Sequence, residues 1–97
     1  MKYRKRPVVI DAWLASDLLY SATKDWKSLP DSVKKAYEKG DVIFHNDYIS
    51  IITLEGRHRA EKTDMVICGV KGELYPCKPD IFEATYEQIY GLRFEIK

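Results

Sequence analysis

The sequence predicts an α+β fold: a curled antiparallel β-meander or small barrel of five to six strands, with one main α-helix inserted after the first strand. Two observations support this prediction. Residues 31–39 repeat their apolar side chains with helical spacing. After Gly40 the spacing changes to two, in short runs separated by turn-forming residues.

The chain length indicates one domain, residues 1–97. A chain of this length buries only about 60–65% of its unfolded surface, so we expect one core and no deep catalytic cleft. Hydrophobic residues make up 45% and charged residues 32%, an ordinary globular balance. The 16 basic and 15 acidic residues nearly cancel, which argues against a dedicated nucleic-acid-binding protein.

The sequence contains no apolar run of about 18 residues, so we expect no membrane span. Asp11 interrupts the apolar run that follows the charged start MKYRKRPVVIDAWL. A signal peptide needs about 7–15 uninterrupted apolar residues. We therefore expect a cytosolic protein with reduced cysteines.

The N-terminal third begins with a polar arm, KYRKR, which ends at Pro7. The β-branched run 8–10 predicts a strand that continues to Ala12 or Trp13. In the segment 14–25, three leucines have helical spacing, which favours a short helix.

The main helix is predicted at residues 31–39. Val33, Ala36 and Tyr37 fall on one face, and lysines dominate the other. Pro30 suits the first turn, and Gly40 is the expected left-handed stop.

The remaining residues predict strands joined by turns. The polar strand is expected at a sheet edge, because charges protect edges from pairing. After Pro79 we expect one helical turn, with proline at its start. The predicted strands are 42–44, 48–54, 57–61 (the polar one), 65–70, 73–77 and 92–96, with the helical turn at 80–84.

The stretch GVKGELYPCKPDIFE, residues 69–83, predicts a hairpin with a two-residue turn at Lys71-Gly72. In that register Cys68 opposes Tyr75, and Val66 opposes Cys77. Both faces of the hairpin are then mostly apolar, so we expect it to lie in the centre of the fold.

The same register places Cys68 and Cys77 diagonally on one face, about 7–8 Å apart, too far for an unstrained disulfide. Their spacing lacks the C-x-x-C pattern of metal sites. We expect two free, buried structural thiols, no metal and no cofactor.

Two interpretations of the charges around this hairpin remain open. Lys71 and Lys78 flank its ends, and Asp80 follows Lys78. They are either solvated surface charges, with Asp80 favouring the start of the helical turn, or a site where the lysines and an exposed tyrosine hold an anionic partner group.

Catalytic patterns are weak. His45 falls in a turn and His58 on the polar strand, and the hairpin register places neither near the cysteines. The sequence shows neither a paired nucleophile and base nor a phosphate-binding glycine loop. We therefore expect no enzymatic activity.

Aromatic residues favour a binding function. Seven tyrosines and two tryptophans supply large contact area at low entropic cost. We expect Trp13, Trp26, Phe44 and Phe82 to fill the core. Nucleic-acid binding would use KYRKR and residues 57–59, with Tyr3 or Tyr48 stacking, but the near-neutral charge makes it the weaker alternative.

Two segments carry a resemblance. The run RKRPVVIDA, residues 4–12, and the run GVKGELYPCKPDIFEATY, residues 69–86, resemble a family of small, mostly uncharacterised proteins of tailed bacteriophages and prophages. Its members start with an RKKPVVIEA-like segment and finish with GVKGEFYPCKPDIFEKTYE. Here Leu74 stands where an aromatic residue is common, and residues 14–64 carry little of the resemblance.

The resemblance implies a phage accessory protein in the cytoplasm of an infected bacterial host. We hypothesise a non-enzymatic counter-defence protein that blocks a host defence protein or sequesters a nucleotide-type signal. A homo-oligomer of this chain is a candidate state for such a role. The alternatives are a structural or morphogenetic phage component and a small DNA-binding regulator. The candidate binding residues are Tyr48, Arg59, Lys71, Tyr75, Lys78 and Asp80.

Overall fold

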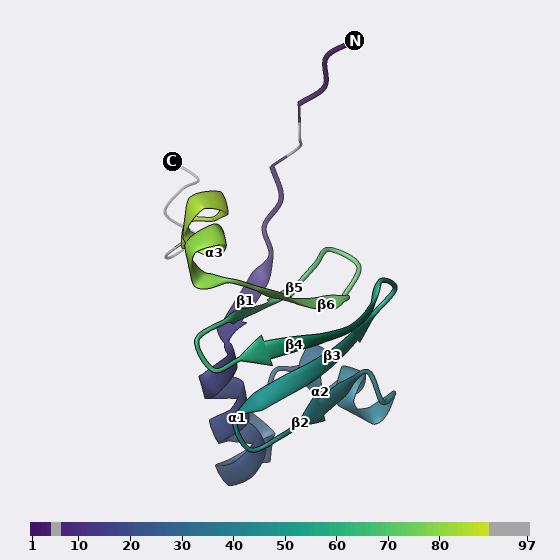
Figure 1. The fold of residues 1–97 in the computed structure, drawn as a ribbon, viewed down its shortest axis with the longest axis vertical. Helices are drawn as coiled ribbons and strands as arrows, with labels where there is room; N and C mark the ends of the chain where they lie inside the picture. Colours follow the sequence, from purple (N-terminus) through teal and green to yellow (C-terminus); the bar gives the residue numbers. More distant parts are fainter. Residues whose placement is uncertain (5–6, 90–97) are drawn as a thin grey trace.

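The computed structural model describes residues 1–4 and 7–89 (Figure 1). Six strands and three α-helices, together with one short 3-10 helix, make an α+β fold in this part of the chain. The elements are β1 (Asp11–Leu14), α1 (Ala15–Lys24), the 3-10 helix η1 (Trp26–Ser28), α2 (Asp31–Glu38), β2 (Val42–Phe44), β3 (Tyr48–Thr53), β4 (Gly56–Glu61), β5 (Met65–Cys68), β6 (Leu74–Cys77) and α3 (Pro79–Thr85).

The strands form two antiparallel three-stranded sheets, ordered β1-β5-β6 and β2-β3-β4 (Figure 1). The prediction of one curled meander or barrel is therefore wrong for the described residues. The chain leaves the first sheet after β1, builds the second sheet, and returns to pair β5 with β1. Hairpin turns fix the pairs β2–β3, β3–β4 and β5–β6, but the β1–β5 pair joins residues more than 50 positions apart and has no local signal.

The β2-β3-β4 sheet has one buried and one outward face. Ile49, Ile51 and Ala60 are at most 1% exposed on the inner face. Tyr48 and Arg59 lie on the outer face, because side chains alternate along each strand. As predicted, the polar strand β4 is an edge strand.

Helix α1 lies within the segment 14–25, where a short helix was predicted, and it belongs to the core. Its buried face carries Ala15, Leu18 and Leu19, and it packs against β3 and β4. The sequence prediction counted one main helix, at 31–39. Burial of the leucines stabilises a second helix, because most helical stability in proteins comes from packing of an apolar face.

Helix α2 confirms the predicted helix at 31–39. Val33 and Ala36 are buried, and Tyr37, predicted on the same face, is 46% exposed. Gly40 has a φ of 83°, the left-handed conformation expected at a helix C-terminus.

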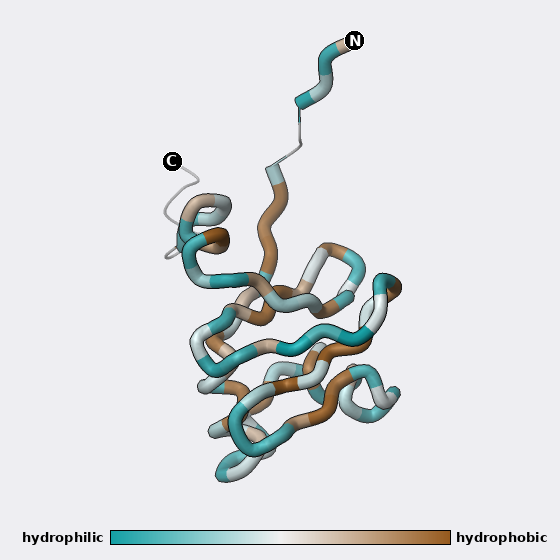
Figure 2. The backbone as a smooth tube through the Cα atoms, in the orientation of Figure 1, coloured by the Kyte–Doolittle hydropathy of each residue, from teal (hydrophilic) through white to brown (hydrophobic). Residues whose placement is uncertain are grey.

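The first strand begins later than predicted. The run 8–10 is extended but unpaired, and β1 starts at Asp11. Asp11 lies opposite Cys68, where β5 ends, so the three residues before Asp11 have no partner strand among the described residues. Figure 2 shows this hydrophobic stretch standing clear of the two sheets.

The β5–β6 hairpin is one residue out of the predicted register. Cys68 lies opposite Leu74, and Val66 opposite Pro76. The loop closes with the Gly69 N–H donating to the Glu73 carbonyl at 2.8 Å, and Gly72 takes a φ of 84°. A five-residue loop therefore replaces the predicted two-residue turn.

The register shift moves every side chain of β6 to the opposite face. Cys68 now lies on the face that packs on the main core, and Cys77 on the opposite face. Both thiols are free, as predicted, but half-buried rather than buried. Leu74 moves to the core side and is 7% exposed.

Helix α3 begins at Pro79, as predicted, and follows β6 without a loop. The side chains of Phe82 and Tyr86 contact each other with ring centroids 5.1 Å apart. Both line a groove with Met65 and Ala12, so α3 lies over the face of the first sheet that is turned away from the main core. The predicted strand 92–96 lies outside the described residues.

Candidate functional site

An aromatic–cationic stack stands on the outer face of the β2-β3-β4 sheet. The Arg59 guanidinium carbon lies 3.7 Å from the centroid of the Tyr48 ring. The His45 ring stacks on the same tyrosine at 4.2 Å, with 13° between the planes. Two groups this close to one ring must cover its opposite faces. Tyr48 is therefore held between a cation and an imidazole.

Strand geometry builds this stack. The Asn46-Asp47 turn joins β2 to β3, and the His45 N–H donates to the Tyr48 carbonyl at 2.9 Å. This pairing places the two rings side by side. Arg59 comes from β4, opposite Ser50, which is two residues along the same face from Tyr48.

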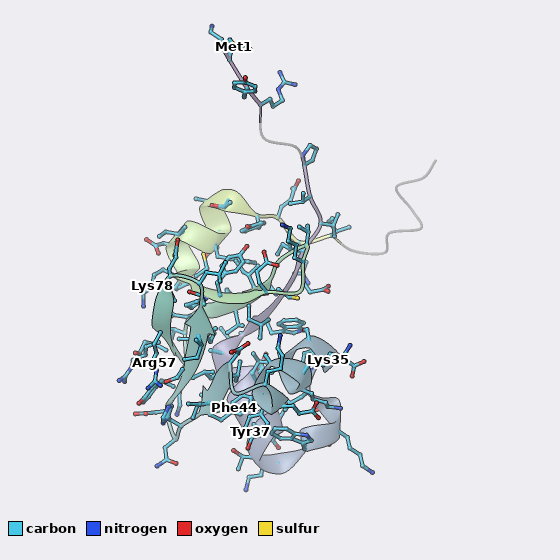
Figure 3. The ribbon with its side chains drawn as sticks, turned by 90° about the vertical axis from the view of Figure 1, so that its right-hand side faces the viewer. Met1, Lys35, Tyr37, Phe44, Arg57 and Lys78 are labelled. Atoms are coloured by element: carbon cyan, nitrogen blue, oxygen red, sulfur yellow. The ribbon has the colours of Figure 1, made fainter. Side chains whose placement is uncertain are left out.

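Arg59 is also oriented by an acid. Its Nε donates to the Glu61 carboxylate, and this hydrogen bond raises the pKa of the guanidinium. Arg57 lies two residues earlier on the same strand face, about 7 Å away by strand geometry. Figure 3 shows Arg57 and Lys78 projecting on the same side of the molecule.

His45 Nε2 and Ser50 Oγ are 3.0 Å apart, the distance of a nucleophile–base pair. Ser50 is only 3% exposed, however. A buried hydroxyl cannot reach a substrate carbonyl. The contact instead satisfies a polar group beneath the stack and fixes the orientation of the His45 ring.

Lys78 closes a second polar cluster, at the turn between β4 and β5. Its Nζ lies 3.1 Å from Asp64 Oδ2. Asp64 is 2% exposed, and the same oxygen accepts the Glu61 N–H at 2.8 Å. The Asp64 carbonyl accepts the Ala15 N–H at 2.9 Å. Asp64 therefore ties together the β4–β5 turn, the start of α1 and the end of β6.

Asp80 lies in the first turn of α3, exposed beside this cluster. The neighbouring Cys77 thiol has a raised pKa, chiefly because it is partly buried, with the negative charges of Asp64 and Asp80 adding to the effect. A raised thiol pKa lowers the thiolate fraction near neutral pH, which disfavours Cys77 as a nucleophile.

A cleft of about 700 Å³ opens between the β5–β6 loop and the end of the second sheet. Lys71 stands at its rim, and Leu74 contributes to its apolar floor. His58 lines it from β4 and is half-buried. The acidic groups at the rim, Asp41, Glu55 and Glu73, outnumber the lysines, Lys39 and Lys71.

Tyr75 borders the cleft, but its side chain belongs to the α3 side of the sheet. It lies opposite Ile67 and forms a hydrogen bond with Tyr86. Burial, with that hydrogen bond, raises the pKa of Tyr75 to about 12. The phenol is therefore neutral at physiological pH and acts as a structural side chain.

A third surface feature is a cluster of three aromatic rings beside α2. Trp26 meets Tyr37 edge-on at 4.9 Å, and Tyr37 stacks on Phe44 at 5.8 Å. Trp26 is 40% exposed, so the expectation that it fills the core is wrong. Figure 3 shows Tyr37 and Phe44 close together.

The structure divides the six predicted binding residues into three groups. Tyr48 and Arg59 form the stack. Lys78 and Asp80 lie at the start of α3, and Lys71 and Tyr75 lie at the hairpin, so Lys71 and Lys78 are at opposite ends of β6. The contacts of the described residues thus give no single site made of Lys71, Lys78 and a tyrosine.

Sequence reasoning missed two residues that organise these groups. The sequence placed His45 in a turn but did not join it to a site, although a tight turn at 46–47 pairs it with Tyr48, a signal available from spacing. Asp64 falls between the predicted strands 57–61 and 65–70. Its burial depends on Lys78, fourteen positions away, and no local pattern indicates it.

Within residues 1–4 and 7–89, no group of three or more His, Cys, Asp or Glu side chains is arranged to hold a metal ion. None of the helices in this part of the chain has the length and apolar character needed to cross a membrane. No protein-family profile, curated protein or solved structure matches the chain.

Proposed function

We propose that the chain is a non-enzymatic binding protein whose stack surface, defined as His45, Tyr48, Arg57 and Arg59, receives an anionic, nucleotide-type ligand. The observation that carries this proposal is the Tyr48–Arg59 contact of 3.7 Å beside a second arginine on an open sheet face. The contact holds a guanidinium plane in a fixed orientation, which lowers the entropic cost of using it in recognition.

The chemistry of the surface favours a phosphate and a flat base. Arginine binds phosphate through paired N–H groups, and Arg57 forms no ion pair with an acid among the described residues. Both faces of Tyr48 are covered, so a base would stack on the open side of Arg59 rather than on the tyrosine. Stacking of bases on arginine planes is an established mode of recognition.

The proposed setting comes from the resemblance to phage proteins at residues 4–12 and 69–86. We propose a phage counter-defence role in the cytoplasm of an infected bacterium, in which sequestering a nucleotide signal blocks a host response. A stoichiometric binder needs no reactive group, which agrees with the buried Ser50 hydroxyl and the raised pKa of the Cys77 thiol.

Isothermal titration against cyclic dinucleotides, ADP-ribose derivatives and mononucleotides tests the proposal. We expect one class to bind, and Arg59→Ala to weaken it about 10- to 100-fold, the usual effect of a charge-assisted contact. Lys35→Ala removes a comparable exposed charge on helix α2, away from the stack surface, and serves as the control.

Two results would overturn this proposal. One is no heat of binding from any nucleotide in the panel. The other is a ligand that binds Arg59→Ala and Arg57→Ala as tightly as the unchanged protein, which would place recognition elsewhere.

A second candidate function is blocking of a host defence protein through the aromatic cluster. Partly exposed tryptophan and tyrosine are enriched in protein interfaces, and Trp26 and Tyr37 are 40% and 46% exposed. A pull-down from infected cells with Trp26→Ala as the comparison separates this candidate from nucleotide binding.

The two remaining alternatives have direct tests. A structural or morphogenetic component would be found in purified virions. A DNA-binding regulator would give a salt-sensitive gel shift that is lost when residues 2–6 are deleted.

A further inference from the structure

The N-terminal arm, of which residues 1–4 and 7–10 are described, pairs with no strand in the described part of the chain. Val8 is 48% and Val9 66% exposed, although β-branched residues favour strands. Figure 1 shows the arm running away from the body, and Figure 2 shows that its stretch near the body is hydrophobic. An extended apolar segment of this kind exposes both side chains and backbone groups that pairing would satisfy.

The adjoining strand β1 also has an open edge. The Ala15 N–H donates to the Asp64 carbonyl, which fixes the phase of the β1–β5 ladder. Bonded pairs alternate along an antiparallel ladder, so the backbone groups of Ala12 and Leu14 face away from β5. In the order β1-β5-β6, no described strand lies on that side.

A groove beside this edge has a distinctive chemistry. It measures about 390 Å³ and lies between residues 8–12 and helix α3. Phe82, Tyr86 and Met65 contribute apolar surface. Among the described residues that line it, the charged ones are both acidic, Asp11 and Glu87.

The segment that complements this groove is the arm itself. Lys2 and Arg4 supply positive charge, and the run 8–10 supplies apolar β-branched side chains. The arm cannot fill its own groove, because residues 8–12 form one wall of it. A second copy of the chain carries the same arm and the same groove.

We propose that the chain forms a two-fold symmetric dimer in which each arm pairs along residues 8–12 of the other copy and lies against its acidic, apolar groove. The two-fold symmetry makes every contact twice. This inference does not rest on the proposed ligand, since the stack surface lies on the other sheet.

Sedimentation velocity on the full chain tests the dimer, with Val9→Asp as the disrupting variant. We expect the dimer dissociation constant to rise at least about tenfold, because a charge replaces an apolar side chain in the interface. Val70→Asp is the matched control: Val70 is 69% exposed in the β5–β6 loop, and this variant should dimerise normally.

A charge-reversal cycle checks the specific pairing of arm and groove. Asp11→Lys with Glu87→Lys should weaken the dimer, and so should Lys2→Glu with Arg4→Glu. Combining all four substitutions should restore association, because the opposite charges are exchanged. All these positions are exposed in the single chain, so circular dichroism should show unchanged folding.

Three outcomes overturn the proposal. The unchanged protein sediments as a monomer at its highest soluble concentration, or Val9→Asp dimerises as readily as Val70→Asp, or the four-fold variant fails to regain association. A monomer that captures a different basic chain in the groove would likewise assign the site to a foreign partner.

Discussion

The buried Asp64 carboxylate shows how one residue can hold several elements together. Burying a charge is costly unless it is paired and hydrogen-bonded. Here Lys78 supplies the positive charge that pairs with the carboxylate, and the Glu61 N–H donates a further hydrogen bond to it. The lysine itself stays more than half exposed. No described buried side-chain nitrogen or oxygen lacks a partner. The cluster is therefore a satisfied structural network.

We predict that Asp64→Asn lowers the free energy of unfolding by about 1–3 kcal/mol, because it removes the charge that Lys78 meets. Urea denaturation measures this change. Glu38→Gln, an exposed substitution on α2, should stay within about 0.5 kcal/mol. An equally small effect of Asp64→Asn would mean that the ion pair adds nothing to stability.

A second prediction concerns Tyr75, whose pKa is raised to about 12 by burial. An unfolded tyrosine titrates near pH 10. Between these pH values the Tyr75 phenol loses its proton in the unfolded chain but keeps it in the folded protein. The free energy of unfolding therefore falls as pH rises from about 10 towards 12. Tyr75→Phe should remove this part of the pH dependence, measured by urea denaturation at several pH values.

Absorbance titration provides the control for Tyr75. One tyrosine of the folded protein that titrates late should return to the ordinary range in denaturant and should be missing in Tyr75→Phe. Identical titration curves for the folded variant and the unchanged protein would refute the assignment.

At the scale of elements, the turns decide where helices and strands stop. Gly40 ends α2 and Gly72 shapes the β5–β6 loop, both with positive φ. At Gly40 an added Cβ would meet no atom within 4 Å, so the restriction there is conformational rather than steric crowding. The two glycines thus fix the directions in which β2 and β6 leave their turns.

We predict that Gly40→Ala costs about 1 kcal/mol of stability, because alanine disfavours the left-handed conformation. Gly40→Asn should cost less, since asparagine tolerates that conformation better. Thermal unfolding of the two variants checks the order. If alanine is tolerated as well as asparagine, backbone conformation does not limit this position.

At the scale of the whole molecule, strand β5 is the element shared by two apolar layers. Val66 faces the main core with Leu74, and Ile67 faces the α3 side with Tyr75. Both Val66 and Ile67 are 1% exposed. The fold is therefore layered: the second sheet and its helices, then the first sheet, then α3.

We predict that Ile67→Ala lowers the free energy of unfolding by about 2–5 kcal/mol, as at a fully buried site. Ile43→Ala, on an edge strand with 38% exposure, is the matched control and should cost less than about 1 kcal/mol. Hydrogen exchange should show α3 and β6 loosened in the first variant. A small cost at Ile67 would mean that the α3 layer contributes little to stability.

The sequence by itself determined the features that local chemistry controls. The helical spacing and terminal glycine predicted α2, and Pro79 predicted the start of α3. Apolar residues on both faces of the 65–77 hairpin predicted a central position. The burial of Val66 and Ile67 confirms it for β5, but β6 is an edge strand of its sheet. Each of these follows from interactions between residues close in sequence.

Only the tertiary structure decided the pairing of β1 with β5, the one-residue register of the β5–β6 hairpin and the burial of Asp64. It also separated Lys71 from Lys78 and brought His45, Tyr48 and Arg59 into one stack. The physical reason is that long-range contacts depend on which apolar faces pack together. Side-chain period two makes a shift of a single residue reverse every face of a strand.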